Sequence, residues 1–150
     1  MDIHLGDVSH TIQLAIAPVF LLTGIGTKLT VLTNRLGRII DRSRVLEDRV
    51  GKSGSGAEHS HDLEELATLY RRSHLINRAI TLSTSSALLI CVMIAALFIG
   101  SALDVGLAKF IATLFVLAML ALIGSFLFFL REILVATATM SIRRIPHVET

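Results

Sequence analysis

The side chains that could do chemistry in this chain follow one helical seam. Thr23, Thr27, Thr30 and Asn34 are separated by steps of four, three and four residues, which place side chains on one face of a helix. Hydroxyl and amide groups exchange hydrogen bonds with water, with ions or with a neighbouring helix. This polar seam therefore predicts close packing against another helix, a water-filled path for ions or small solutes, or contact with a protein partner.

A second polar stretch precedes the middle of the chain. Asn77, Thr81 and Thr84 follow each other at steps of four and three residues, so they also share one face of a helix. If the two segments are antiparallel neighbours, the two polar stretches lie at the same depth. The alternatives of packing and water therefore apply to both.

Lys28 is the one charged residue in the first apolar block and is counted with the polar seam. An ionised lysine inside a bilayer is costly and is often functional. Lys28 stands four residues before Leu32, about 6 Å along a helix, and Leu32 ends the block. We therefore expect its ammonium group to reach the lipid headgroups, as long side chains do near helix ends.

Four arginines form a basic cluster after the seam: Arg35, Arg38, Arg42 and Arg44. Carboxylates interleave with the basic residues of this region. That mixture favours salt-bridged helices or anionic lipid headgroups over nucleic acid. Arg131 and Glu132 lie at the end of the third apolar block, and the sequence leaves open whether they pair with neighbours or with Arg38 and Asp41.

The catalytic patterns that sequence reading can detect are missing. The chain has no Gly-rich phosphate loop after a strand, no nucleophile elbow and no metalloprotease pair. His59 and His61, beside Glu58, are weak candidates for a metal site, but histidines in a Gly/Ser-rich stretch are more often solvated. We therefore expect no enzyme, no cofactor and no metal.

Three apolar blocks must position these residues. They cover 12–32, 80–99 and 110–130 in a chain of 150 residues that is 53% hydrophobic and has a mean hydropathy of +0.71. Each block holds about 20 residues, enough for a helix to cross a hydrocarbon core of about 30 Å. The sequence predicts an all-α integral membrane protein with three transmembrane helices, at about 12–33, 79–99 and 109–131.

The first two spans are predicted to continue outside the membrane. Residues 34–78 read as a helical hairpin with a flexible Gly/Ser-rich turn at 51–61, and Asp62 reads as the N-cap of its second arm. The third span continues as helix to about residue 144, before Pro146. An apolar seam opposite the polar one is expected to be buried: Ile25, Leu29, Leu32, Leu36, Ile39 and Leu46.

The basic residues predict the orientation. Nine Lys and Arg lie between the first and second spans, and only Lys109 lies between the second and third. The positive-inside rule then places the N-terminus outside, the hairpin in the cytoplasm, the loop 100–108 outside and the C-terminus in the cytoplasm.

Four short motifs carry a resemblance to a known family: Ala-Pro-Val-Phe at 17–20, Asn-Arg-Leu at 34–36, Asp-Arg at 41–42 and Ile-Asn-Arg-Ala at 76–79. The chain resembles, over nearly its whole length, a bacterial family of small three-span membrane proteins catalogued as a domain of unknown function. The resemblance implies a bacterial inner-membrane protein and supplies no activity, ligand or catalytic residue.

Two functions follow as expectations. One is a homo-oligomer whose polar seam forms an ion or small-solute pathway, because a three-span protomer is too small to enclose a conduit alone. The other is a structural or regulatory membrane protein whose cytoplasmic hairpin binds a partner or lipid. Expected partners are further copies of the chain, membrane lipids including anionic headgroups, and a cytoplasmic protein, but not nucleic acid.

Overall fold

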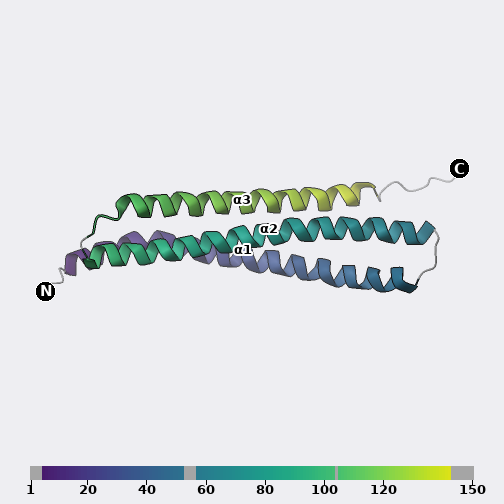
Figure 1. The fold of residues 1–150 in the computed structure, drawn as a ribbon, viewed down its shortest axis with the longest axis horizontal. Helices are drawn as coiled ribbons and strands as arrows, with labels where there is room; N and C mark the ends of the chain where they lie inside the picture. Colours follow the sequence, from purple (N-terminus) through teal and green to yellow (C-terminus); the bar gives the residue numbers. More distant parts are fainter. Residues whose placement is uncertain (1–4, 53–56, 104, 143–150) are drawn as a thin grey trace.

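Three long helices make up the protein. The computed structural model describes residues 5–52, 57–103 and 105–142, in which α1 spans Leu5–Lys52, α2 spans Ala57–Leu103 and α3 spans Ala108–Ile142 (Figure 1). These described ranges contain no strand. All three helices are long and apolar enough to cross a membrane. The prediction of an all-helical protein with three membrane-spanning helices is therefore confirmed.

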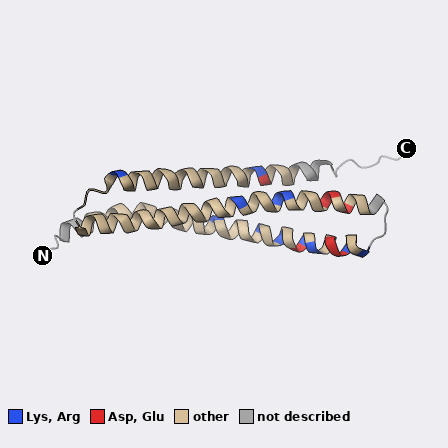
Figure 2. Ribbon diagram, viewed as in Figure 1, with Lys and Arg blue, Asp and Glu red and all other residues tan. Residues whose placement is uncertain are grey.

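Each helix is longer than a bilayer requires. The 48 residues of α1 correspond to about 72 Å of helix, against about 30 Å of hydrocarbon. The helix continues without a break through Pro18, which lies inside α1. Figure 2 shows most charged residues on the half of the bundle next to the α1–α2 connection, while the opposite half is largely uncharged. We call these halves the hairpin end and the apolar end.

The bundle is built around α2. It runs antiparallel to both other helices and packs along each of them (Figure 1). Among the described residues, no Cα atom of α1 comes within 8 Å of a Cα atom of α3. Contact between α1 and α3 is therefore made by side chains reaching across, and those side chains form the candidate site described below.

Four of the six residues in the predicted apolar seam of α1 are buried, and the other two, Leu29 and Leu36, are half-buried. Ile25, Leu32, Ile39 and Leu46 recur every seven residues and are at most 5% exposed. The last three form one cluster with buried residues of α2, including Ile76. A seven-residue repeat keeps one face of a long helix against its neighbour, so this seam sets which face of α1 points away from the bundle.

Several helix ends differ from the predicted ones. The turn predicted at 51–61 is shorter, because α1 continues to Lys52 and α2 begins at Ala57. Asp62 consequently lies inside α2 and caps no helix end. The helix α2 also continues to Leu103, into the loop predicted at 100–108, and α1 begins at Leu5 rather than near residue 12. Residues 143–150, with Pro146, lie outside the described residues.

Candidate functional site

A fully buried carboxylate ties the three helices together at the hairpin end. Glu132 of α3 is 0% exposed. One of its oxygens, Oε2, accepts a hydrogen bond of 2.7 Å from Nη1 of Arg35 on α1. The other, Oε1, accepts bonds of 3.1 and 2.9 Å from Nε and Nη2 of Arg72 on α2. We call Arg35, Arg72 and Glu132 the triad.

The triad compensates the burial of charge. A buried carboxylate is strongly unfavourable unless ionised donors satisfy its lone pairs. Both oxygens of Glu132 are satisfied here, and the two-pronged bond from Arg72 adds geometric specificity. The guanidinium of Arg35 also lies 5.4 Å from the ring centroid of Phe129 on α3. The triad therefore fixes the register of all three helices at one level.

Lys28 occupies the equivalent place two helical turns away. Its Nζ donates a hydrogen bond of 2.8 Å to Oγ of Ser125 on α3 and lies 3.6 Å from the ring centroid of Phe126. Ser125 in turn bonds Ser83 of α2 at 2.7 Å and the backbone oxygen of Ala79. A buried hydroxyl and an aromatic face on α3 hold the ammonium group against the bundle. That Lys28 also reaches the lipid headgroups stays a prediction.

The sequence contained one signal for these contacts. Lys28 and Arg35 are seven residues apart on α1, and their partners Ser125 and Glu132 are seven residues apart on α3. Matching spacings of polar residues on two apolar helices are compatible with cross-helix bonding at two successive levels. Glu132 pairs with Arg35 and Arg72 rather than with Arg38, one of the partners that the sequence left open, because the pairing depends on helix register.

The polar seam of α1 faces away from the bundle. Thr23, Thr27, Thr30 and Asn34 are all exposed. The three threonine hydroxyls donate to backbone oxygens four residues earlier on α1, over 3.1 to 3.4 Å. The seam is therefore not packed against α2 or α3, and its hydroxyls do not depend on a cross-helix donor or acceptor.

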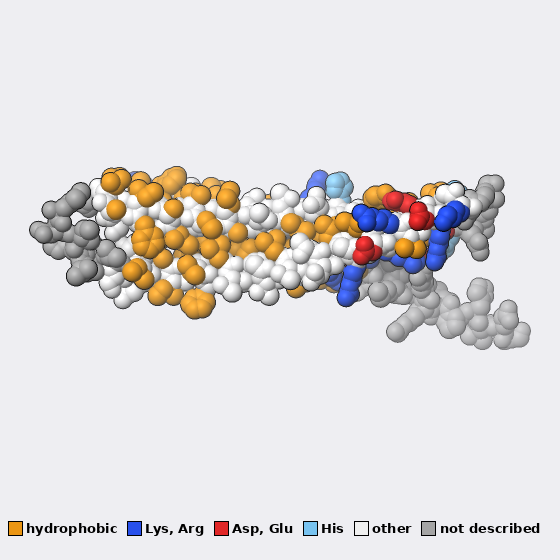
Figure 3. Space-filling view, turned by 90° about the horizontal axis from the view of Figure 1, so that it is seen from below, with side chains coloured by type: hydrophobic (Ala, Val, Ile, Leu, Met, Phe, Trp, Pro, Cys, Tyr) orange, Lys and Arg blue, Asp and Glu red, His pale blue; other side chains and the backbone are white. Residues whose placement is uncertain are grey.

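The polar stretch of α2 lies on the same side of the α1–α2 pair as part of that seam. Asn77, Thr81 and Thr84 are exposed, and both threonines also bond their own helix. At about 100° per residue, these three point away from α3, as do Thr30 and Thr33. In the view from the side away from α3, white atoms, which are backbone and side chains that are neither apolar nor charged, are prominent between the apolar end and the hairpin end (Figure 3).

Glycines also leave open space on the surface of α1. A Cβ atom added at Gly24, Gly26 or Gly37 would meet no atom within 4 Å. In membranes, helices approach closely where small residues line the contact. In the described bundle, no other helix packs against α1 at these three glycines.

The four arginines of the predicted basic cluster do not share one binding partner. Arg35 belongs to the triad, whereas Arg42 donates from Nε and Nη2 to Oε1 of Glu65 at 3.1 and 2.9 Å. Arg38 and Arg44 are exposed. The cluster therefore divides into one buried link between helices, one hairpin ion pair and two exposed cations.

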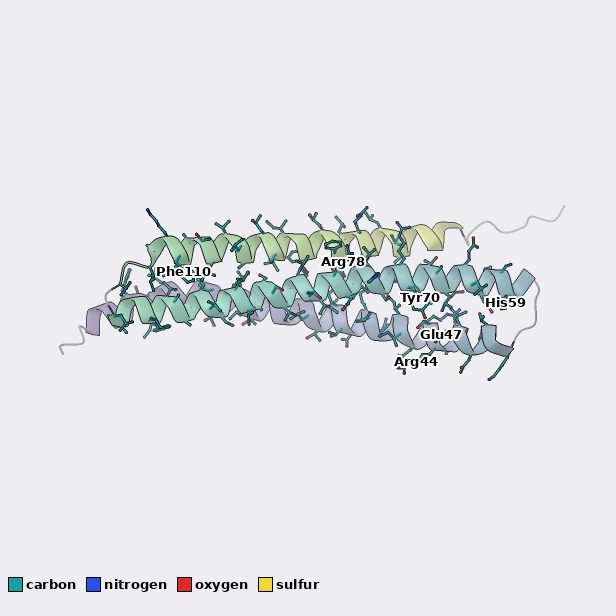
Figure 4. All side chains as sticks on the ribbon, viewed as in Figure 1. Arg44, Glu47, His59, Tyr70, Arg78 and Phe110 are labelled. Carbon is teal, nitrogen blue, oxygen red and sulfur yellow. The ribbon has the colours of Figure 1, made fainter. Side chains whose placement is uncertain are left out.

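The two arms of the hairpin are also joined by Tyr70 and Glu47. The Tyr70 hydroxyl on α2 donates to Oε1 of Glu47 on α1 over 2.7 Å (Figure 4). This hydrogen bond, with the charge of Glu47, raises the pKa of Tyr70 above its usual value. His59 lies at the tip of this hairpin. No group of three or more metal-ligating side chains occurs in the part of the chain that the structure describes, so His59 and His61 gain no third ligand there.

Comparison with known proteins adds one match. A family described as "Protein of unknown function (DUF2721)" matches residues 15–142. The chain belongs to this family. No curated protein and no solved structure matches it. The region matched within this DUF2721 protein contains the triad, the Lys28 contacts and both polar stretches, so the features described here all lie inside the family domain.

This DUF2721 protein also has an apolar hollow of about 670 Å³ at the apolar end. All three helices line it, with Pro18 of α1, Met93 of α2 and Phe115 of α3 among its walls. Convergent polar groups are what orient a substrate in a pocket. The wall of this hollow contains a cross-helix hydrogen bond, in which Oγ1 of Thr11 on α1 donates to Oγ of Ser101 on α2 over 3.1 Å. The triad and the Lys28 contacts lie outside the hollow.

Proposed function

We propose that this membrane protein works as a homo-oligomer in which the polar seam of α1 lines a pathway for ions or small solutes. The carrying observation is that Thr23, Thr27, Thr30 and Asn34 are exposed on the outside of the bundle, on a helix long and apolar enough to cross a membrane. The proposed setting is the bacterial inner membrane, with the hairpin end in the cytoplasm.

The burial pattern supports an outward role for the seam. Within the chain, α1 already buries its apolar seam against α2 and extends Lys28 and Arg35 to α3. The remaining face has small side chains, open glycines and the Asn34 amide. Lipid offers an amide no hydrogen bond, whereas water or a polar neighbour does. Several copies arranged around this face would bring their seams to a common axis.

Flux through proteoliposomes tests the proposal. Thr27→Leu keeps the helix and removes one hydroxyl from the seam. Thr113→Leu is a matched control, because Thr113 is exposed on α3 and its hydroxyl also bonds its own backbone, at Lys109. We expect Thr27→Leu to reduce flux of a small cation or solute and Thr113→Leu to leave it unchanged. A monomeric wild-type protein without flux would contradict the proposal.

A second candidate function is supported by the hairpin surface. Ile40, Val45 and Leu63 are 39%, 47% and 46% exposed, although they lie beyond the apolar spans. A protein partner that covered these side chains would remove their apolar surface from water. In this alternative the hairpin binds a cytoplasmic protein, and no transport or catalysis occurs. Val45→Asp with Leu63→Asp should then remove a copurifying protein that Arg44→Ala retains, whereas an unchanged set of copurifying proteins would contradict it.

A further inference from the structure

Positive charge is concentrated at one level of the bundle, around the triad. The bonds of Lys28 to Ser125 and of Arg35 to Glu132 place residues 28–38 of α1 at the same level as residues 125–135 of α3. The bond of Arg72 to Glu132 places residues 71–83 of α2 at that level too. These three segments contain seven Lys and Arg residues and one carboxylate, Glu132. That carboxylate is fully buried and already shared by two arginines.

Four of these basic side chains are exposed, and all three helices contribute at least one of them. We call them the arginine belt: Arg38 of α1, Arg71 and Arg78 of α2, and Arg131 of α3. None of the four makes an ion pair with a carboxylate in the described part of the chain. Arg78 lies 5.8 Å from the ring centroid of Phe128 on α3, a placement that holds its charge beside the bundle surface.

The outer part of the hairpin has the opposite balance. Segments 39–52 and 59–70 contain four Lys and Arg residues and six Asp and Glu residues. Ion pairing with carboxylates also occurs there, as in the bonds of Arg42 to Glu65. A nucleic acid or an acidic protein approaching the hairpin from water would therefore meet net negative charge before reaching the belt.

The level of the belt identifies its partner. Arg131 and Arg78 lie one and two residues from the ends of the apolar blocks 110–130 and 80–99, and Arg38 and Arg71 lie six and nine residues beyond the blocks of their helices. Lipid headgroups stand at this end of the spans, and long arginine side chains can reach back to them. Exposed arginines at this depth attract anionic headgroups, and guanidinium groups bond phosphate oxygens in a two-pronged geometry. We propose that the arginine belt binds anionic phospholipids, whose acyl chains lie against the apolar surface of the spans. This inference uses the proposed orientation but not the proposed pathway.

Lipid titration of the purified full chain in mild detergent tests it. The probes are phosphatidylglycerol, which carries one negative charge, and phosphatidylcholine with the same acyl chains, which carries none net. Bound lipid is counted by native mass spectrometry. We expect wild-type protein to prefer phosphatidylglycerol, and the preference to fall as salt is raised, because salt screens exposed charges.

Two variants that remove the same number of positive charges distinguish an effect of where the charges lie from an effect of net charge. The belt variant replaces Arg38, Arg71, Arg78 and Arg131 with Gln. The tip variant replaces the four basic residues of the outer hairpin with Gln: Arg42, Arg44, Arg49 and Lys52. Each belt arginine near an anionic surface should contribute about fivefold in affinity. The belt variant should therefore lose more than tenfold, and the tip variant should stay within about threefold of wild type.

Three results would overturn the inference: equal losses in both variants, equal binding of the two lipids by wild type, or competition by free glycerol phosphate as strong as by the lipid. Thermal unfolding without added lipid checks that each variant is folded. If the belt variant is not folded, the single variants Arg38→Gln and Arg131→Gln, on different helices, should each lower affinity about fivefold. Liposome flux is measured separately, so loss of the pathway and loss of lipid binding are distinguishable outcomes.

Discussion

Replacing Glu132 with Gln should destabilise the bundle more than any single change on its outer surface. The substitution keeps the side-chain shape but removes the charge that two arginines share. Arg35 and Arg72 would then face each other without a counter-charge, with side chains only 36% and 24% exposed. Removing one partner of a buried ion pair typically costs about 3 to 5 kcal/mol. Partial exposure of the arginines screens part of this, so we expect a loss of about 3 kcal/mol.

The assay is reversible unfolding in mixed detergent micelles, followed by helical circular dichroism. A triple variant sharpens it: Glu132→Leu with Arg35→Met and Arg72→Met removes all three charges together. Replacing a whole buried ionic group by apolar residues is often neutral or stabilising, so the triple variant should be more stable than Glu132→Gln. A loss below about 1 kcal/mol for Glu132→Gln, or a triple variant less stable than it, would refute the view that charge compensation holds the triad.

Three further changes test the packing and the hairpin. Leu32→Ala should cost about 2 to 5 kcal/mol, because Leu32 is 0% exposed and its removal leaves a cavity; Val31→Ala on the outer face of α1 should cost under about 1 kcal/mol in the same unfolding assay. Lys28→Met should cost about 1 kcal/mol, the usual size of a cross-helix hydrogen bond in a membrane, and a loss above about 3 kcal/mol would mean that Lys28 carries more than this contact. Tyr70 is the only tyrosine, so ultraviolet titration reports it alone: its pKa should lie above the usual value and fall towards it in Glu47→Gln. Because neutral Tyr70 is the donor, this hairpin contact stabilises the fold below pH about 10 and is lost as the pH rises through the raised pKa.

Periodic features of the sequence predicted the fold well. Uncharged blocks of the right length predict spans whatever their neighbours are, and the repeat of Ile25, Leu32, Ile39 and Leu46 predicts the buried face of α1 because burial follows helical period. The helix ends near residues 51–61 were less predictable. Gly and Ser weaken a helix without ending it, and the structure keeps Gly51 inside α1.

Contacts between helices were predicted poorly, because they depend on register. The depth of Lys28 is visible in the sequence, but the hydroxyl of Ser125 that accepts its hydrogen bond comes from a helix 97 residues later. The pairing of Glu132 with Arg35 and Arg72 likewise depends on how far three helices slide along one another. The exposure of the polar seam was left open for the same reason: the sequence shows a face but not what stands opposite.

Thiol labelling of the polar seam tests the central proposal most directly. Cys91 is the only cysteine, so Cys91→Ser gives a background in which Thr27→Cys is the sole thiol. Ile123→Cys is the control at similar depth, since Lys28 bonds Ser125 and Ile123 is 51% exposed on the outer face of α3. If the seam lines a water-filled pathway, a charged, membrane-impermeant thiol reagent should label Thr27→Cys in native membranes and leave Ile123→Cys unlabelled. Failure to label Thr27→Cys, or equal labelling at both positions, would contradict the account.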